Sequence, residues 1–172
     1  MRSLLCLTMI GFGMLIVGCD SSDVATKAKV KSAAPSSQFV LDTEPDGALA
    51  VGEARAATQD GQDVTLVGLI GGSSEPFVDG LAAFTIVDAK IPYCAADEGC
   101  DTPWDYCCES DAVKDNIATI NIVDASGNPV AANARELLNV KELSTVVVKG
   151  KAKRDEQGNL TVATSEVFVR QN

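Results

Sequence analysis

Residues 117–138, IATINIVDASGNPVAANARELL, contain a strand-like segment, a turn and a helix-like segment in succession. The first part, residues 117–125, is rich in β-branched side chains and therefore predicts a strand. Ser, Gly and Asn favour turns, so residues 126–128 predict a turn. Pro129 in a first helical turn, with Asn128 as its cap, predicts a helix that ends near Leu138. The stretch thus places one helix directly after a strand.

Segments on both sides of this stretch predict the remaining elements. The further strands are residues 64–70 (VTLVGLI), 82–89 (AAFTIVDA), 145–154 and 159–170. A short turn containing glycine, residues 155–158, joins the last two strands as a hairpin. Gly68 lies in the middle of its strand and predicts a bulge or a sharp bend there. Residues 45–57 predict a short leading helix with Asp46 as its cap.

The resulting order is strand, strand, strand, helix, strand, strand, which resembles the OB-fold. The resemblance implies a mostly β domain, a five-stranded OB-fold-like Greek-key barrel with one helix between strands 3 and 4. It also places a cysteine-rich insert between strands 2 and 3, where proteins of this fold bind their ligands. The competing fold is an open five-stranded sheet with the helix on one side. Residues 42–172 are long enough for one domain with one core, and not for two.

The N-terminus predicts an exported protein. A short apolar run at residues 4–17 suits a signal peptide and is too short to span a membrane as a helix. It ends in Ile16-Val17-Gly18-Cys19, which resembles the lipobox of bacterial lipoproteins. The resemblance implies a signal peptide at residues 1–18 and an acylated Cys19 that attaches the protein to the lipid bilayer of the bacterial cell envelope, with the domain outside the cytoplasm. The alternative is a plain secretory signal with a chance cysteine.

Residues 19–41 predict a flexible tether between this anchor and the domain. The segment is rich in Ser, Ala and Lys and has no apolar periodicity. Such a composition cannot bury enough surface to offset the entropy of ordering the chain.

Composition excludes several functions. The chain has no histidine, which removes Ser-His-Asp and Cys-His catalysis and the commonest metal ligand. Without the signal and the tether, ten basic and 22 acidic residues leave a net charge near −12. Because Lys and Arg supply most of the affinity for phosphate backbones, this charge argues against nucleic-acid binding. We therefore expect no enzymatic activity.

Residues 93–108, YCAADEGCDTPWDYCC, form a cysteine-rich loop that carries Cys94, Cys100, Cys107 and Cys108. An even number of cysteines in an exported domain favours two disulfides, with Cys94 bonded to Cys107 or to Cys108 and Cys100 to the other. Alternatively, four thiolates can close a Zn²⁺ site or hold iron, although the spacing lacks the usual C-x2-C pairs. A redox-active thiol is the third hypothesis. Nearby carboxylates are either added oxygen ligands or a solvated acidic rim: Asp97, Glu98, Asp101, Asp105 and Glu109.

The same loop contains Tyr93, Trp104 and Tyr106, which include the only tryptophan of the chain. Aromatic side chains of this kind either cover a disulfide or form a recognition surface for proteins and sugars. The sequence therefore predicts a non-catalytic, lipid-anchored envelope binding module that presents a disulfide-stapled loop to a protein or glycan partner. The alternative function is a Zn or Fe domain built on the four cysteines. No other cofactor is predicted.

Overall fold

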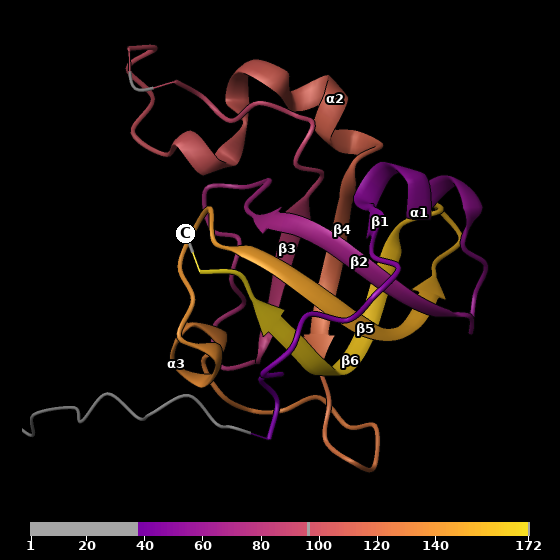
Figure 1. Cartoon of the computed structure of the whole chain (residues 1–172). Coiled ribbons are helices and arrows are strands. Elements are labelled where there is room, and N and C mark those ends of the chain that lie inside the picture. Colours follow the sequence, from indigo (N-terminus) through magenta and orange to yellow (C-terminus); the bar gives the residue numbers. More distant parts are fainter. Residues whose placement is uncertain (1–37, 96, 172) are drawn as a thin grey trace, which may run out of the picture. The chain divides into compact units, whose positions relative to one another are not determined.

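The computed structural model describes residues 38–95 and 97–171 (Figure 1). Its elements, in chain order, are β1 (Leu49–Ala50), α1 (Val51–Ala57), β2 (Asp63–Ile70), β3 (Ala83–Val87), η1 (Pro103–Asp105), η2 (Cys107–Glu109), α2 (Ser110–Lys114), β4 (Ile117–Ile122), α3 (Ala134–Leu138), β5 (Thr145–Arg154) and β6 (Leu160–Val169), where η1 and η2 are 3₁₀ turns. All five strands expected from the sequence are present, and their bounds differ from the expected ones by a few residues.

The strand pairing closes the sheet into a barrel. β2, β3 and β4 form an antiparallel meander, β4 pairs in parallel with β6, β6 pairs antiparallel with β5, and β5 pairs antiparallel with β2. This is the Greek-key order of a five-stranded OB-like barrel, with α3 between its third and fourth strands. The predicted fold class is confirmed, and the open-sheet alternative is wrong because β2 and β5 pair over seven residues from Asp63 to Leu69.

Side chains that alternate along the strands fill the barrel. In β2, for example, every second residue from Val64 to Ile70 is buried, as the period of two in a strand requires when one face lies inward. Leu66, Ile86, Ile122, Val146 and Val148, one or more from each of β2 to β5, are fully buried. The barrel therefore has one continuous apolar core that includes no residue of the cysteine loop.

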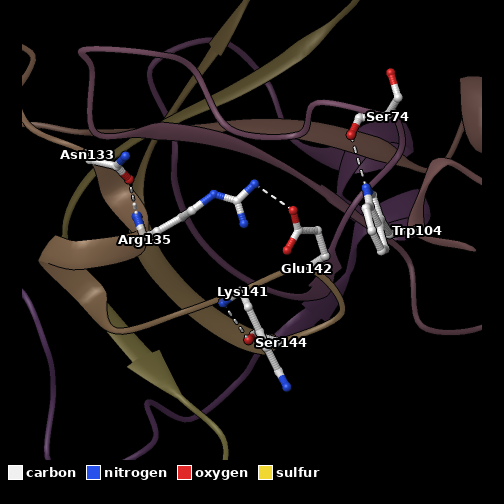
Figure 2. Close-up of polar contacts among 7 residues, drawn as sticks. All are labelled: Ser74, Trp104, Asn133, Arg135, Lys141, Glu142 and Ser144. Atoms are coloured by element: carbon white, nitrogen blue, oxygen red, sulfur yellow. Dashed lines mark hydrogen bonds and ion pairs between the residues drawn. The ribbon is translucent and has the colours of Figure 1, made fainter. Parts of the chain in front are cut away.

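The helix α3 begins five residues later than the sequence predicted. Pro129 forms an isolated antiparallel bridge with Val123 instead of opening the helix. The cap is Asn133, whose side-chain oxygen accepts a hydrogen bond from the backbone N–H of Arg135 (Figure 2). The prediction of Asn128 as cap was wrong because residues 124–128 form a turn that brings Pro129 back against Val123 before the helix begins.

The leading helix is also shorter than expected. It begins at Val51, and its cap position is Ala50, so Asp46 does not cap it. Residues just before it form β1, which pairs in parallel with β2 and adds a short strand to the barrel. Gly68 marks a close approach and not a bulge: a Cβ there would meet the Val87 carbonyl oxygen at 2.8 Å. The register shift lies instead in the pairing of β5 with β6, where Lys149 faces Glu166 and Gly150 faces Thr164.

The domain begins before the predicted boundary at residue 41. Phe39 is buried in the core, and Val40 forms a parallel bridge with Val167 of β6. The end of the expected tether is therefore part of the barrel. Burying the apolar surface of Phe39 and Val40 gains more free energy than is lost by ordering these residues. The predicted signal peptide, Cys19 and the tether up to residue 37 lie outside the described residues. Among residues 38–95 and 97–171, no helix is long and apolar enough to cross a membrane.

Candidate metal centre

The four cysteines of the insert bring their sulfur atoms together. The Sγ of Cys107 lies 3.5 Å from that of Cys94, 3.3 Å from that of Cys100 and 3.8 Å from that of Cys108, and Cys94 and Cys108 are 3.7 Å apart. All four sulfurs lie within 4.8 Å of one another. A metal ion at about 2.3 Å from each of four tetrahedral thiolates would place the sulfurs about 3.8 Å apart. The observed separations are close to this value.

The expected disulfides are not formed. All four thiols are free, and the shortest sulfur–sulfur distance is 3.3 Å, whereas a disulfide requires about 2.05 Å. The Cys107 sulfur lies near all three others and the Cys94 sulfur near both Cys107 and Cys108, so the contacts do not divide into two separate pairs. This arrangement is that of a shared ligand set rather than of two separate bonds.

Local structure explains how adjacent cysteines can contribute to one cluster. An extended chain would direct the side chains of Cys107 and Cys108 to opposite sides. In the structure they lie in the 3₁₀ turn η2, where three residues complete a turn and adjacent side chains diverge less. Tyr106 precedes them in the left-handed conformation, with φ of 58°, and reverses the chain between the turns η1 and η2.

Asp105 holds this reversal in place. Its carboxylate accepts hydrogen bonds from the Thr102 hydroxyl at 2.7 Å and from the backbone N–H of Cys107 at 2.8 Å. The Thr102 hydroxyl, and then the amide of Cys107, lower the pKa of Asp105 below its usual value. Pro103 occupies the start of η1, where its missing N–H costs nothing. The sequence TPWDYCC thus encodes two turns that aim both cysteines at the cluster.

The pKa values of the thiols differ because each thiol has different hydrogen-bonding neighbours. The backbone N–H of Cys108 donates toward Cys94 and lowers the pKa of that thiol. Close contact with the Cys107 sulfur raises the pKa of Cys100 far above its usual value, and the Cys94 sulfur raises the pKa of Cys108 to about 11. Four adjacent thiolates repel one another, so the four thiols do not all lose their protons in the absence of a cation. A bound metal cation offsets this repulsion and stabilises the thiolates.

Carboxylates lie beside the cysteines in the sequence without joining the cluster. Among the described residues, the group close enough to share one metal ion consists of the four cysteines alone. Asp105 bonds to Thr102 and Cys107, and Glu98 accepts a hydrogen bond from the backbone N–H of Ala95. Asp97, Asp101 and Glu109 are exposed. The ligand set is therefore formed by sulfur alone, and the exposed carboxylates near it in the sequence, Asp97, Asp101 and Glu109, are called its acidic rim.

The two ends of the insert emerge side by side from the barrel. The backbone N–H of Asp88, just after β3, donates to the carbonyl of Asn116, just before β4, at 2.9 Å. The buried Asp88 carboxylate accepts from the N–H of Gly52 in α1 and from the N–H of Lys90. These bonds tie the base of the insert to α1.

Within the insert, one small apolar cluster supports the sulfurs. Tyr106 is 0% exposed and packs with Val87, Val113, Ile91 and Ile117. Among the described residues its hydroxyl has no hydrogen-bond partner. Burial, and then the proximity of Tyr93, raise the pKa of Tyr106 to about 12. The prediction that Tyr106 belongs to a recognition surface was wrong, because its side chain is enclosed.

The other two aromatic residues reach the surface to different extents. Tyr93 is 47% exposed. Trp104 is half-buried, and its indole N–H donates to the Ser74 carbonyl at 3.1 Å (Figure 2). The three aromatic residues of the loop therefore do not form a single exposed patch.

The turn after β2, at Gly71 and Gly72, contacts the insert. The sequence did not predict this contact. The N–H of Gly72 donates to the Trp104 carbonyl at 2.8 Å. A Cβ at Gly71 would lie 2.6 Å from that same carbonyl oxygen and 3.0 Å from the Tyr106 ring. By itself a pair of glycines indicates only a turn. Its closeness to the insert follows from the pairing of β2 with β3, which no local pattern encodes.

No protein-family model matches the sequence, and no curated protein does so either. Among solved structures, the hypothetical protein ygiW from E. coli aligns with a TM-score of 0.40 and 15% identity, over 73% of this chain and 94% of that protein. The aspartyl tRNA synthetase from Entamoeba histolytica aligns with a TM-score of 0.44 and 8% identity, over 79% of this chain and 25% of the synthetase. Both similarities are too low to carry an argument, and the barrel assignment rests on the strand pairing.

Proposed function

We propose that the domain binds one metal ion, zinc in the first instance, through Cys94, Cys100, Cys107 and Cys108. The convergence of four free sulfurs within 4.8 Å of one another is the observation that carries this proposal. Soft thiolates prefer soft or borderline cations, and four of them in a tetrahedral set suit Zn²⁺. An iron–sulfur cluster suits the site less well, because its inorganic sulfides lie between the irons and spread the thiolates apart.

The proposed role of the metal is to hold the insert in shape without chemistry at the metal. A four-thiolate site has no open coordination position, whereas catalytic zinc keeps one for water or substrate. The absence of histidine from the chain further supports a non-catalytic module. In this proposal the metal takes the place of the two disulfides that the sequence suggested.

The module is proposed to be anchored in the bacterial cell envelope through a lipid on Cys19 and to bind an envelope protein or glycan through the insert. Tyr93 and the half-buried Trp104 are the aromatic residues available for such contacts. The net charge near −12 of the domain opposes nucleic acid as the partner.

Elemental analysis and intact mass together test the metal proposal. The full chain, purified without reductant, should contain about one zinc per molecule and retain the four insert thiols in reduced form. Cobalt should replace zinc and give thiolate-to-cobalt charge-transfer absorption. A mass 4 Da below the reduced value, with no bound metal, would instead show that the disulfide hypothesis was right.

Two substitutions make the test specific. Cys94→Ser should lower the bound metal well below one equivalent, because three thiolates leave the tetrahedral set incomplete. Asp97→Asn alters an exposed neighbour outside the ligand set and should leave the stoichiometry unchanged. Loss of metal in both variants, or in neither, would contradict the four-cysteine site.

The anchor is tested separately. Cys19→Ser should leave the chain unprocessed or release it from the membrane fraction, since the acyl group supplies the attachment. A Cys19→Ser protein that still fractionates with membranes and is processed after Gly18 would exclude the lipoprotein hypothesis without affecting the metal site.

A further inference from the structure

The four cysteines lie at different depths. Cys94 is 3% exposed, and its N–H donates to the Pro103 carbonyl inside the insert. Cys100 is half-buried, whereas Cys107 and Cys108 are both exposed. A metal ion held by this set would therefore have one side enclosed by the insert and the other side facing solvent.

The solvent side is also strongly negative. From Ile91 to Val113 the chain contains six carboxylates and no Lys or Arg. Of these carboxylates, Asp97, Asp101 and Glu109 are exposed and form no ion pair in the described part of the chain. Like charges gathered in one segment raise the local concentration of cations and their rate of encounter. The rim is thus suited to attract a cation to the open side of the site.

We infer that the metal is exchangeable and is handed to a thiol-bearing acceptor across Cys107 and Cys108. This inference rests on the proposed metal site and adds a function to it, namely uptake and transfer of a soft cation. Where all the ligands of a metal ion are buried, the ion leaves only when the surrounding fold opens. Here the two exposed ligands are consecutive residues in one 3₁₀ turn, so an acceptor can reach both without unfolding the barrel.

The transfer step conserves charge and needs no oxidant. An acceptor thiol loses its proton and bonds to the metal while the bond from the metal to the Cys107 sulfur breaks. The released Cys107 thiolate takes up a proton, so no net proton is lost. A second acceptor thiol replaces Cys108 in the same way, and the buried Cys94 and the half-buried Cys100 release the ion last. No sulfur changes its oxidation state.

The kinetics of metal loss test this mechanism. The zinc-loaded full chain is mixed with increasing excess of 2,3-dimercaptopropanol, and the zinc remaining on the protein is measured after rapid desalting. Attack by the acceptor predicts a rate that rises about tenfold when the acceptor concentration rises tenfold. A rate that does not change with acceptor concentration would overturn the inference, because it would mean that the protein must open first.

Pulsed alkylation locates the open side. Brief treatment with iodoacetamide during transfer, followed by peptide mass analysis, should label Cys107 and Cys108 before Cys94. Equal labelling of all three at early times would contradict transfer across the exposed pair.

The rim is tested by a pair of triple variants that remove the same charge. The first carries Asp97→Asn, Asp101→Asn and Glu109→Gln, and the second carries Asp42→Asn, Asp46→Asn and Glu156→Gln, which alter exposed residues outside the insert. At low ionic strength the first should take up zinc several-fold more slowly than the second. The difference should vanish near 1 M salt, where the screening length falls to about 3 Å. Equal uptake rates at low salt would exclude steering by the rim.

These outcomes separate two failures. A protein that binds no zinc fails the proposed function. A protein that binds one zinc per molecule and loses it at a rate independent of the acceptor retains the proposed function and fails only the transfer inference.

Discussion

The barrel and the insert are built in opposite ways. In the barrel, five strands pair around a closed ring (Figure 1). A continuous set of side chains from every strand fills the interior. In the insert, residues 88–116 contain two 3₁₀ turns and the five-residue helix α2. Its apolar cluster has three buried members, Val87, Tyr106 and Val113, one of which belongs to β3.

This difference shows where each region obtains its stability. The barrel buries enough apolar surface to fold on its own, and closure leaves none of its five strands as a free edge. The insert buries too little to order its backbone, so it depends on the sulfur cluster and on its contacts with the turn at Gly71 and Gly72. We therefore expect changes in the barrel to affect global unfolding and changes in the insert to affect local opening.

The largest expected effect lies in the barrel. Leu66→Ala removes a fully buried side chain and should lower the free energy of unfolding by about 2–5 kcal/mol. Leu81→Ala, at a 40% exposed position, should change it by less than about 0.5 kcal/mol. Chemical denaturation followed by circular dichroism measures both. Similar losses in the two variants would contradict the assignment of the core.

A smaller effect is expected where the two regions meet. Gly71→Ala places a methyl group against the Trp104 carbonyl and the Tyr106 ring, so the insert must shift. Overpacking of this kind costs about 1–3 kcal/mol. Hydrogen exchange should increase in residues 102–114, with little change in the strands. Ser73→Ala, at an exposed neighbour, should leave exchange unchanged. Faster exchange throughout the barrel after Gly71→Ala would show that the regions are not independent.

A stabilising change is expected at Tyr106. Its buried hydroxyl has no partner among the described residues, and a buried hydroxyl without a hydrogen bond costs about 1–3 kcal/mol. Tyr106→Phe should therefore slow local exchange in the insert or leave it unchanged. Tyr93→Phe, at an exposed position, should have no effect. Faster exchange in Tyr106→Phe would mean that the hydroxyl forms a bond, such as one to an enclosed water molecule.

The smallest expected effect is a local loosening of the insert at low pH. The hydrogen bonds of the folded insert lower the pKa of Asp105 below its ordinary value of 3.8. The ionised Asp105 carboxylate therefore stabilises the insert fully above pH 3.8, and this stabilisation is lost as the pH falls through the lower pKa of the folded state. Acidification should therefore loosen residues 102–109 without unfolding the barrel, as measured by amide exchange in the metal-free protein. Asp105→Asn should remove most of this pH dependence, and Asp101→Asn should not. An unchanged pH profile in Asp105→Asn would assign the effect to another group.

Local pattern was sufficient for most of the barrel. Strands β5 and β6 and their hairpin turn follow from valine-rich runs on either side of Asp155–Gly158, because turn residues and side-chain period act over a few positions. Helix starts were less accurate. Both Asp46 and Asn128 have the chemistry of a cap, but the start of α1 is set by the pairing of β1 with β2, and that of α3 by the bridge of Pro129 to Val123.

By itself the sequence determined the order of the elements, the place of the insert and the identity of its four thiols. It left their chemistry open, because the relative positions of Cys94, Cys100, Cys107 and Cys108 depend on contacts among residues far apart in the chain. Only the tertiary structure brought the four sulfurs to one point, left Cys107 and Cys108 open to solvent and enclosed Tyr106. Spacing along a chain fixes which groups are available, whereas packing against Gly71 and Gly72 decides which of them meet.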